Sequence, residues 1–427
     1  MKLQKLPTGE QNFAVVKETN RLYVDKTHFV HELLEYNNRN IFLSRPRRFG
    51  KSLFLSTLKE VFLGRKDLFQ GLYIEDKIEW KKHPVIHLDF SRIDFKELGL
   101  HKAIENTLQD ISKSYGIELL KEGIALRFQE LIHKLYDQEG EQVAILIDEY
   151  DKPITEYLEF EEQAFEQRDI LRSFYGILKG NSAHIRMAFI TGISRFSKVS
   201  LFSDLNNFSD ISFEETFNDI CGYTKEELVE NFKGHLEALA ERRKMTYEEA
   251  LEKVREWYNG YSWDGENRVY NPYSILRLLD SNQFSNYWFE SGTPKLLIKL
   301  LKPDFKFRLK DVEVDMGTFN NYDLSNLNVE TLLFQTGYLT VKEKTPFDSF
   351  ILGYPNGEVE QSMLQYLLID YSENQRGSAI ANNLIRAIRS HDLDYFIETL
   401  NVLFANIPAE IFIRNREAYF HSIVYIS

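Results

Sequence analysis

Residues 41–58, IFLSRPRRFGKSLFLSTL, place the tripeptide Gly50-Lys51-Ser52 between an apolar run and a helical pattern. In a phosphate-binding loop, successive backbone N–H groups and the N-terminus of the next helix attract the phosphates. The glycine allows close approach, the lysine neutralises phosphate charge, and the hydroxyl is a ligand of Mg²⁺. The tripeptide alone recurs by chance, but a strand before it and a helix after it supply the required context. The residues predicted to bind a nucleotide here are Arg48, Phe49, Gly50, Lys51, Ser52 and Leu53, with Ser52 also a metal ligand.

Arg45 stands where the usual pattern GxxxxGK[ST] has its first glycine. That glycine mainly eases entry into the turn, whereas Gly50 lies at the point of close approach. Replacing it removes no N–H donor, and Pro46 restricts the turn. We therefore expect the loop to function despite Arg45. The sequence leaves open whether Arg47 and Arg48 face phosphates, a partner or solvent.

A second candidate site, made of acidic residues, follows the apolar run at 142–147 in the segment QVAILIDEY. A continuous apolar run is typical of a strand buried on both faces, and Asp148 and Glu149 stand at its end, as in a Walker B motif. Asp148 would hold Mg²⁺ through water, and Glu149 would orient and polarise the attacking water in phosphoryl transfer. The alternative is a solvated strand end. We predict Asp148 as a metal and cofactor residue and Glu149 as a catalytic residue.

The segment ITGISR, residues 190–195, ends another predicted strand. An additional strand between the loop and Asp148 favours the sheet order 5-1-4-3-2 of ATPases with a Walker B glutamate. In that sheet this strand tip faces the γ-phosphate, so Thr191, Ser194 or Arg195 could sense it. We choose Arg195 as the second catalytic residue, because a guanidinium can stabilise transition-state oxygens. The alternative for Arg195 is a solvent-facing loop residue.

The elements that must position these residues follow an α/β pattern. Strands are predicted at 40–44, 84–90, 142–150 and 184–192, with a short fifth at 210–213, and helices between them, the clearest at 168–180. Strands alternating with helical patterns indicate a parallel sheet covered by helices. The predicted fold class is therefore a P-loop NTPase α/β domain, spanning residues 1–218.

After about residue 218 the pattern becomes helical. Thr224 and Thr246 are predicted N-caps, and Asn271 caps a helix that begins with Pro272. Short strand-like pieces return between about 305 and 355, including 337–343 and 349–355, and residues 357–371 open a last helical stretch. We predict a helical lid at 219–300 and a mixed, mostly helical C-terminal region at 301–427.

Composition narrows the class of protein. The 427 residues carry a formal charge of -13, which argues against a surface that generally coats nucleic acid. One cysteine, Cys221, forms no disulfide framework and fits a reducing compartment. No HExxH or CxxC motif occurs, and the ten histidines have no ligand spacing. With no signal peptide and no apolar span, the expectation is a cytoplasmic protein without membrane contact.

Several stretches together resemble the bacterial AAA-ATPase-like family. They are LYVDKTHFVHELLEYNNRNIFLSRPRRFGKSLFLSTL (22–58), LIDEYDKPI (146–154), FITGISRFSKVSLFSDLNNFSDIS (189–212), WYNGYSW (257–263), VYNPYSIL (269–276) and FQTGYLT (334–340). The resemblance implies an ATP-binding α/β module with a helical lid, and ATP and Mg²⁺ as ligands. Lys51 and Ser52 match the phosphate-loop positions, and Asp148 and Glu149 match the Walker B positions. Residues 23–27 match a segment that approaches the adenine or simply packs the N-terminal arm.

Family members commonly carry a C-terminal PD-(D/E)XK nuclease domain. Its first helix would begin near residues 415–427, NREAYFHSIVYIS, and the sequence stops at Ser427 before any catalytic strand. Two spellings of the nuclease motif, at 75–77 and 79–81, precede the strand at 84–90 rather than ending one, so we expect no nuclease activity from this chain.

The sequence is compatible with three functions. The first is an ATPase whose hydrolysis moves the sheet domain against the lid. The second is an ATP-gated binding module with little turnover, acting on a protein or nucleic-acid partner, and the third is a nuclease. Steady-state phosphate release separates the first two. The oligomeric state stays open.

Overall fold

The computed structural model describes residues 3–195, 207–288, 311–315, 328–347, 349–371 and 392–405, together with positions 309, 319, 383, 386 and 387. The nuclease-like segment at 415–427 and part of the 189–212 match lie outside the described residues.

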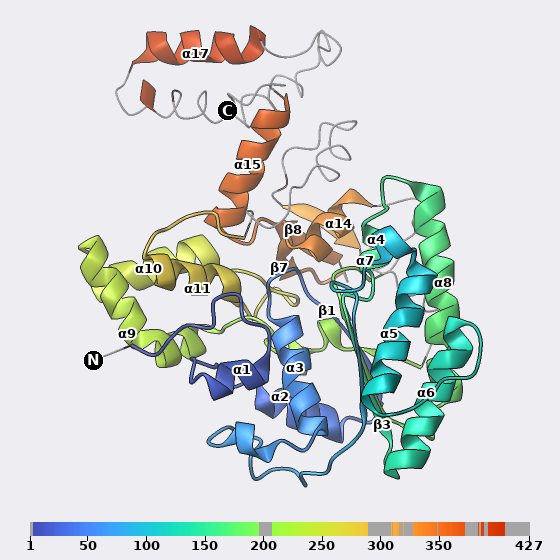
Figure 1. Ribbon diagram of the computed structural model, residues 1–427. Coiled ribbons are helices and arrows are strands. Elements are labelled where there is room, and N and C mark those ends of the chain that lie inside the picture. Colours follow the sequence, from blue (N-terminus) through green and yellow to red (C-terminus); the bar gives the residue numbers. More distant parts are fainter. Residues whose placement is uncertain are drawn as a thin grey trace.

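The central element is a parallel sheet of five strands (Figure 1). Its strands are β1 (Asn40–Ser44), β2 (Val85–Asp89), β3 (Val143–Asp148), β4 (Ile185–Gly192) and β5 (Ser209–Asp210). Each neighbouring pair is parallel, and the order is β2-β3-β4-β1-β5, which reads 5-1-4-3-2 from the β5 edge. In such a sheet the carboxyl ends of the strands meet at one edge, where ligands usually bind.

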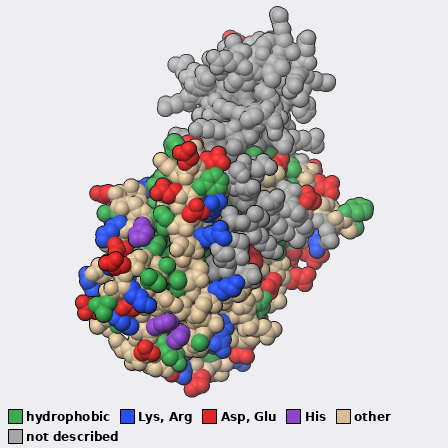
Figure 2. Space-filling model, turned by 90° about the vertical axis from the view of Figure 1, so that its right-hand side faces the viewer, with side chains coloured by type: hydrophobic (Ala, Val, Ile, Leu, Met, Phe, Trp, Pro, Cys, Tyr) green, Lys and Arg blue, Asp and Glu red, His purple; other side chains and the backbone are tan. Residues whose placement is uncertain are grey.

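Helices cover both faces of this sheet (Figure 1). One side carries α1 (Phe13–Glu18), α2 (Thr27–Glu35) and α3 (Lys51–Phe62), and the other carries α5 (Leu100–Ser114), α6 (Ile124–Glu139) and α8 (Glu161–Gly180). Short helices α4 (Phe95–Leu98), α7 (Lys152–Thr155) and η1 (Lys66–Phe69) fill connections. Figure 2 shows the face that carries α8, where acidic and basic side chains are interspersed.

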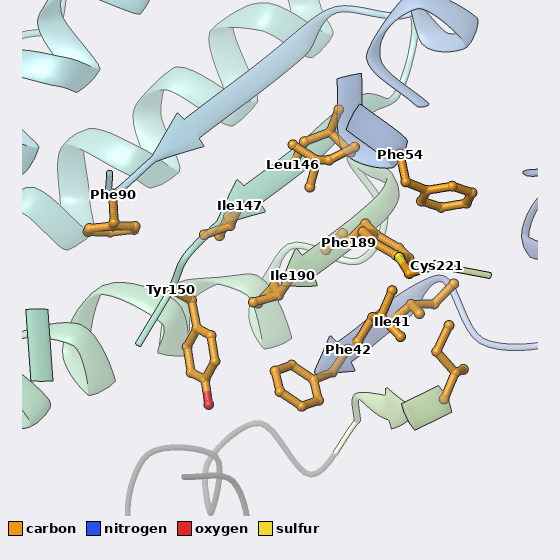
Figure 3. Close-up of a cluster of buried hydrophobic side chains, with 14 of the residues drawn as sticks. Ile41, Phe42, Phe54, Phe90, Leu146, Ile147, Tyr150, Phe189, Ile190 and Cys221 are labelled. Atoms are coloured by element: carbon orange, nitrogen blue, oxygen red, sulfur yellow. The ribbon is translucent and has the colours of Figure 1, made fainter. Parts of the chain in front are cut away.

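The core lies between these layers, and its residues come mainly from the strands. All six residues of β3 are buried. Figure 3 shows Ile41 and Phe42 of β1 beside Phe189 and Ile190 of β4, with Phe54 of α3 near them. Each fully buried side chain of this kind contributes about 1.5–3 kcal/mol. The core thereby fixes the strand ends that carry the candidate site.

The predicted fifth strand at 210–213 is wrong in its last three residues. Strand β5 ends at Asp210, and Ile211–Phe213 forms a 3-10 turn. The Asp210 side chain accepts a hydrogen bond from the backbone N–H of Ser212, which bends the chain out of the sheet. A short Asp side chain competes with strand pairing in this way.

The helices of residues 219–300, the predicted lid region, begin at the predicted caps. They are α9 (Lys225–Arg243), α10 (Tyr247–Tyr258) and α11 (Pro272–Ser281). Thr224 and Thr246 each form a complete capping box, and the Asn271 side chain accepts from Ser274 N–H. These three N-cap predictions are confirmed.

A second, antiparallel sheet follows in the order β6-β8-β7. Its strands are β6 (Val312–Asp315), β7 (Thr340–Lys344) and β8 (Ser349–Gly353). The helices of this part of the chain are α14 (Val329–Thr336), α15 (Gly357–Tyr371) and α17 (Leu393–Ala405). The predicted helix at 357–371 matches α15. Within the described part of the chain, no helix has the length and apolar content needed to cross a bilayer.

Candidate functional site

The predicted residues gather where β1, β3 and β4 end. The loop after β1 runs from Arg45 to Gly50, and β3 ends at Asp148. The loop after β4 begins at Ile193. These three segments meet because their strands are adjacent and parallel.

The loop before α3 presents a row of unbonded backbone donors. The N–H groups of residues 47–53 donate to no acceptor within the described residues. Gly50 caps α3 in the left-handed region, at φ 95°, where a side chain is disfavoured. Exposed N–H groups at a helix N-terminus attract an anion. The loop is therefore built as an anion cradle although Arg45 replaces the first glycine.

Lys51 occupies the centre of this cradle. Its buried ammonium donates to the carbonyl oxygens of Arg45, at 2.8 Å, and Pro46, at 3.0 Å. Burial lowers the pKa of Lys51, and the nearby carboxylates of Asp148 and Glu149 oppose that decrease. The ammonium thus lies between the loop and the two acidic residues.

The contacts of the Arg45 side chain explain why the loop tolerates an arginine in place of the usual first glycine. The side chain is fully buried and donates to the carbonyls of Ser212, at 2.9 Å, and Phe217, at 2.8 Å. Its guanidinium lies 3.9 Å from the centre of the Trp263 ring, and burial lowers its pKa to about 10. The cation therefore stays charged at neutral pH and joins the loop to residues 212–218.

The next two arginines are exposed beside the cradle and line its cavity. Arg48 has φ 67°, and its guanidinium lies 4.4 Å from the centre of the Tyr273 ring on α11. The Arg47 carbonyl accepts a hydrogen bond from the Trp288 indole N–H at 3.1 Å. Both arginines are thus placed to meet a ligand, while Arg48 also contacts a lid helix.

A cavity of about 390 Å³ opens over the loop. This volume lies within the range of small-molecule sites. The lining residues are Pro7, Gly9, Glu10, Gln11, Arg47, Arg48, Phe49, Gly50, Lys51, Ser52, Leu53, Ser91, Glu149, Lys152, Glu156, Tyr223, Pro272, Tyr273 and Leu276. The cavity therefore combines the N-terminal segment, the loop, the β3 end and lid helix α11.

Two predicted loop residues contribute differently from expectation. The Phe49 ring is buried against Tyr261 and Trp263, and its carbonyl accepts from Gly222 N–H at 3.2 Å. Phe49 therefore offers a backbone N–H to a ligand, and its ring anchors the loop. Leu53 lines both this cavity and a smaller one of about 60 Å³ beside it.

Residues 23–27 border the smaller cavity and also pack the N-terminal arm. Tyr23, Val24 and Lys26 line that cavity. The Lys26 ammonium pairs with Glu227 of α9 at 2.7 Å and donates to the Asp219 carbonyl. The segment therefore packs against α9 and the residues before it, and its approach to an adenine stays a prediction.

Asp148 and Glu149 have distinct settings. Asp148 is buried and accepts a hydrogen bond of 2.5 Å from the Thr191 hydroxyl of β4. Glu149 lines the cavity with φ 50°, and its carboxylate lies 3.4 Å from the Lys152 ammonium. One carboxylate is thus fixed at the sheet edge, and the other faces the ligand space.

Arg195 does not line the cavity. Its guanidinium pairs with Asp210 at 2.6 Å and lies 4.6 Å from the centre of the Phe213 ring. Its backbone N–H donates to the Gln335 side chain at 3.2 Å. The arginine therefore ties the β4 loop to β5 and α14 in this structure, whereas the cradle residues and Glu149 share one cavity.

Sequence reasoning missed the residue that holds the β4 loop. Asp151 is buried and accepts from the N–H groups of Ile193 and Ser194, the latter at 2.7 Å. Burial raises the pKa of Asp151, and those N–H groups oppose the increase. The Tyr150 hydroxyl donates to the Ser194 carbonyl at 2.9 Å. The signal in the sequence was an acidic residue three positions after Asp148, within the segment DEYD at 148–151.

Lys152 and the lid residues Tyr223, Pro272 and Tyr273 were also missed. Three of them lie in stretches that carry the family resemblance, at 146–154 and 269–276, but their residue types indicate no phosphate chemistry, and only the fold brings all four to the loop. Within the described residues, no group of three or more His, Cys, Asp or Glu side chains is arranged to hold a metal ion.

Comparisons with known proteins give a family match and a relative. A family model described as a predicted AAA-ATPase matches residues 7–202. An uncharacterized protein in the vnfD 5' region of Azotobacter chroococcum mcd 1 is 37% identical over 438 residues, covering 100% of this chain and 83% of that protein. No solved structure matches.

Proposed function

The chain belongs to the AAA-ATPase-like family, and on that premise we propose that it binds ATP and hydrolyses it with Mg²⁺. One observation carries the proposal, the row of unbonded N–H groups at residues 47–53 around the Lys51 ammonium. Backbone donors in this arrangement favour a polyphosphate.

Each residue would have a separate task. Lys51 would exchange the carbonyls of Arg45 and Pro46 for phosphate oxygens, and the N–H groups of 47–53 would hold the rest of the phosphate chain. Ser52 and Asp148 would hold Mg²⁺, which neutralises phosphate charge. Glu149, facing the cavity, would orient and polarise water.

The walls of the cavity support coupling between the sheet domain and the lid. Pro7, Tyr223 and Pro272 supply apolar surface from the N-terminal segment and the lid region, which suits a nucleobase. A ligand held by all of these segments would draw them together. We propose that residues 1–218 form the ATPase domain, residues 219–300 the helical lid, and residues 301–427 a mixed C-terminal region.

A switch with little turnover is the second candidate, and the position of Arg195 favours it. Arg195 pairs with Asp210 outside the cavity, so a transition-state role would require it to leave that carboxylate. We propose that Arg195 is the second catalytic residue if turnover is fast, and a structural residue if ATP is only bound.

Calorimetry with Lys51→Ala tests ATP binding. Wild type should bind MgATP, and the variant should lose at least tenfold in affinity, because charge-assisted hydrogen bonds contribute about 1.5–3 kcal/mol each. Lys59→Ala, on the same helix but outside the cavity, is the matched control and should bind like wild type. Equal affinity in all three proteins would refute the cradle.

Steady-state phosphate release then separates the two candidates. Turnover that disappears in Lys51→Ala supports the ATPase. Tight binding with no release beyond background supports the switch.

A further inference from the structure

The phosphate loop is held from behind by the C-terminal half of the chain. The Trp288 indole N–H donates to the Arg47 carbonyl at 3.1 Å. Gly337, at φ 92°, lies so close that an added Cβ would stand 2.7 Å from Pro46 Cβ and 3.1 Å from the Trp288 ring. Two distant segments therefore pack on adjacent residues of one loop.

Glu358, the second residue of α15, connects Trp288 to helix α11. Its side chain is fully buried. One carboxylate oxygen accepts from the backbone N–H of Trp288 at 2.7 Å, and the other accepts from the Ser274 hydroxyl at 2.8 Å. One acidic side chain at the start of α15 thus bonds both a neighbour of the loop and lid helix α11.

Both partners of Glu358 lead back to the candidate site. Trp288 bonds the carbonyl of Arg47 directly. Ser274 adjoins Tyr273, whose ring lies under the Arg48 guanidinium and lines the cavity. The start of α15 therefore reaches two successive loop residues through separate routes.

The orientation of the loop depends on these bonds. Lys51 holds the carbonyls of Arg45 and Pro46, and Trp288 holds that of Arg47. With these carbonyls bonded to their donors, the N–H groups of the loop stay available to an anion. Loss of the Trp288 bond would let the Arg47 peptide rotate, which would turn a carbonyl toward the phosphates.

We propose that α15 regulates the nucleotide site through Glu358 and Trp288. This inference rests on the proposed function. When α15 is packed in this position, the loop is able to bind a nucleotide. When α15 is displaced, the buried Glu358 carboxylate loses the Trp288 and Ser274 donors, and the loop loses a support. Such an arrangement favours two discrete states, because a partly bonded buried carboxylate is costly. By thermodynamic linkage, nucleotide binding must then stabilise the packed position of α15 by the same free energy with which that position favours nucleotide binding.

Trp288→Phe is the first test, since it removes the indole N–H and keeps an aromatic ring. Trp80→Phe is a matched control, because the Trp80 indole also donates to a backbone carbonyl, that of Glu75 at 2.8 Å, away from the site. We expect MgATP affinity in calorimetry to fall roughly five- to tenfold in Trp288→Phe, the effect of one lost hydrogen bond. Trp80→Phe should bind like wild type.

Glu358 variants keep the test informative if Trp288→Phe folds poorly. Glu358→Gln retains both bonds, since its oxygen accepts from Trp288 N–H and its amide donates to the Ser274 hydroxyl. Glu358→Leu retains neither. The expected order of MgATP affinity is wild type, then Glu358→Gln close to it, then Glu358→Leu at least tenfold weaker. Equal affinity of Glu358→Leu and Glu358→Gln would overturn the proposal.

Hydrogen exchange supplies a readout that a purely structural role would not change. MgATP should slow exchange across residues 357–365 in wild type, and this protection should be reduced in Trp288→Phe at saturating MgATP. If wild type binds MgATP without any protection of α15, this inference fails and the proposed function survives. If wild type binds no nucleotide at all, the proposed function itself has failed.

Discussion

At the residue scale, Glu149 has an unusual backbone conformation. It has φ 50° without being glycine, and Arg48 on the facing loop has φ 67°. Side chains in this region cost about 1–3 kcal/mol, and such residues gather at functional sites. The strain at Glu149 turns the chain directly after β3, so that Asp148 stays at the sheet edge while Glu149 faces the cavity.

Glu149→Gln should separate binding from hydrolysis. The amide keeps the size and position of the carboxylate but polarises water poorly, so MgATP affinity should stay within about twofold. Phosphate release should fall by roughly 10²–10⁴-fold, the usual contribution of a positioned base. Calorimetry and a steady-state phosphate assay give the two values. Hydrolysis at the wild-type rate would show that Glu149 has no catalytic role.

Thr191→Val should weaken the Mg²⁺-dependent part of nucleotide binding. The hydroxyl donates to Asp148, and valine has nearly the same shape without that donor. ATP affinity with Mg²⁺ should fall several-fold, in line with one hydrogen bond to a charged group, and affinity in EDTA should not change. Thr107→Val on α5, which loses a bond to the Ala103 carbonyl, is the control. An equal loss with and without Mg²⁺ would mean that Thr191 supports folding only.

The sequence allowed the residues that line the cavity to be predicted better than those that support them. Lys51, Ser52 and Glu149 were proposed from the residue types that phosphate chemistry requires at strand ends, and all three line one cavity. Arg45 appeared as a departure from a motif, since its acceptors are backbone carbonyls of residues 212–218. Backbone acceptors leave no signal in residue type, so this role required coordinates.

At the element scale, the capping boxes of α9 and α10 offer a controlled comparison. Thr224 pairs with Glu227, and Thr246 pairs with Glu249, with the same bonds in both. Glu227 also pairs with the buried Lys26 at 2.7 Å, whereas Glu249 is exposed. The first box therefore fastens the lid to the N-terminal segment, and the second only begins a helix.

Glu227→Ala should destabilise the fold more than Glu249→Ala. Losing a capping partner costs about 1 kcal/mol, and leaving Lys26 buried without its partner should cost roughly a further 3 kcal/mol. Urea unfolding measures both. Adding Lys26→Met to Glu227→Ala should recover much of the extra loss. Equal losses in the two single variants would show that the Lys26 pair contributes nothing.

Helices and strands could be predicted where the signal lies in neighbouring residues of the sequence. The helix beginning at Lys51 and the caps at Thr224 and Thr246 were predictable, because apolar periodicity and capping residues are local properties. The predicted fifth strand was too long, because the Asp210 side chain ends β5. Strand β6 was not predicted as a separate element. A four-residue edge strand such as β6 depends on pairing with β8, which residue order does not encode locally.

At the scale of the whole molecule, the cavity joins three segments far apart in sequence. Residues 7–11 of the N-terminal segment, the loop at 47–53 and residues 272–276 of α11 line the same space. No local pattern indicates that the first and third of these meet the second. Their meeting follows from the sheet order, from the Lys26–Glu227 pair and from the stacking of Arg48 on Tyr273.

This arrangement predicts the pattern of hydrogen exchange on nucleotide binding. Without a ligand, the N–H groups of 47–53 lack acceptors in the described residues and should exchange fast. MgATP should slow exchange in that loop and at the same time in 7–11 and 272–276, because a ligand that contacts all three walls suppresses their separate opening. Lys51→Ala at the same MgATP concentration is the control and should show little protection anywhere. Protection confined to 47–53 would mean that the phosphates bind while the N-terminal segment and the lid stay uncoupled, which would contradict closure of the cavity around one nucleotide.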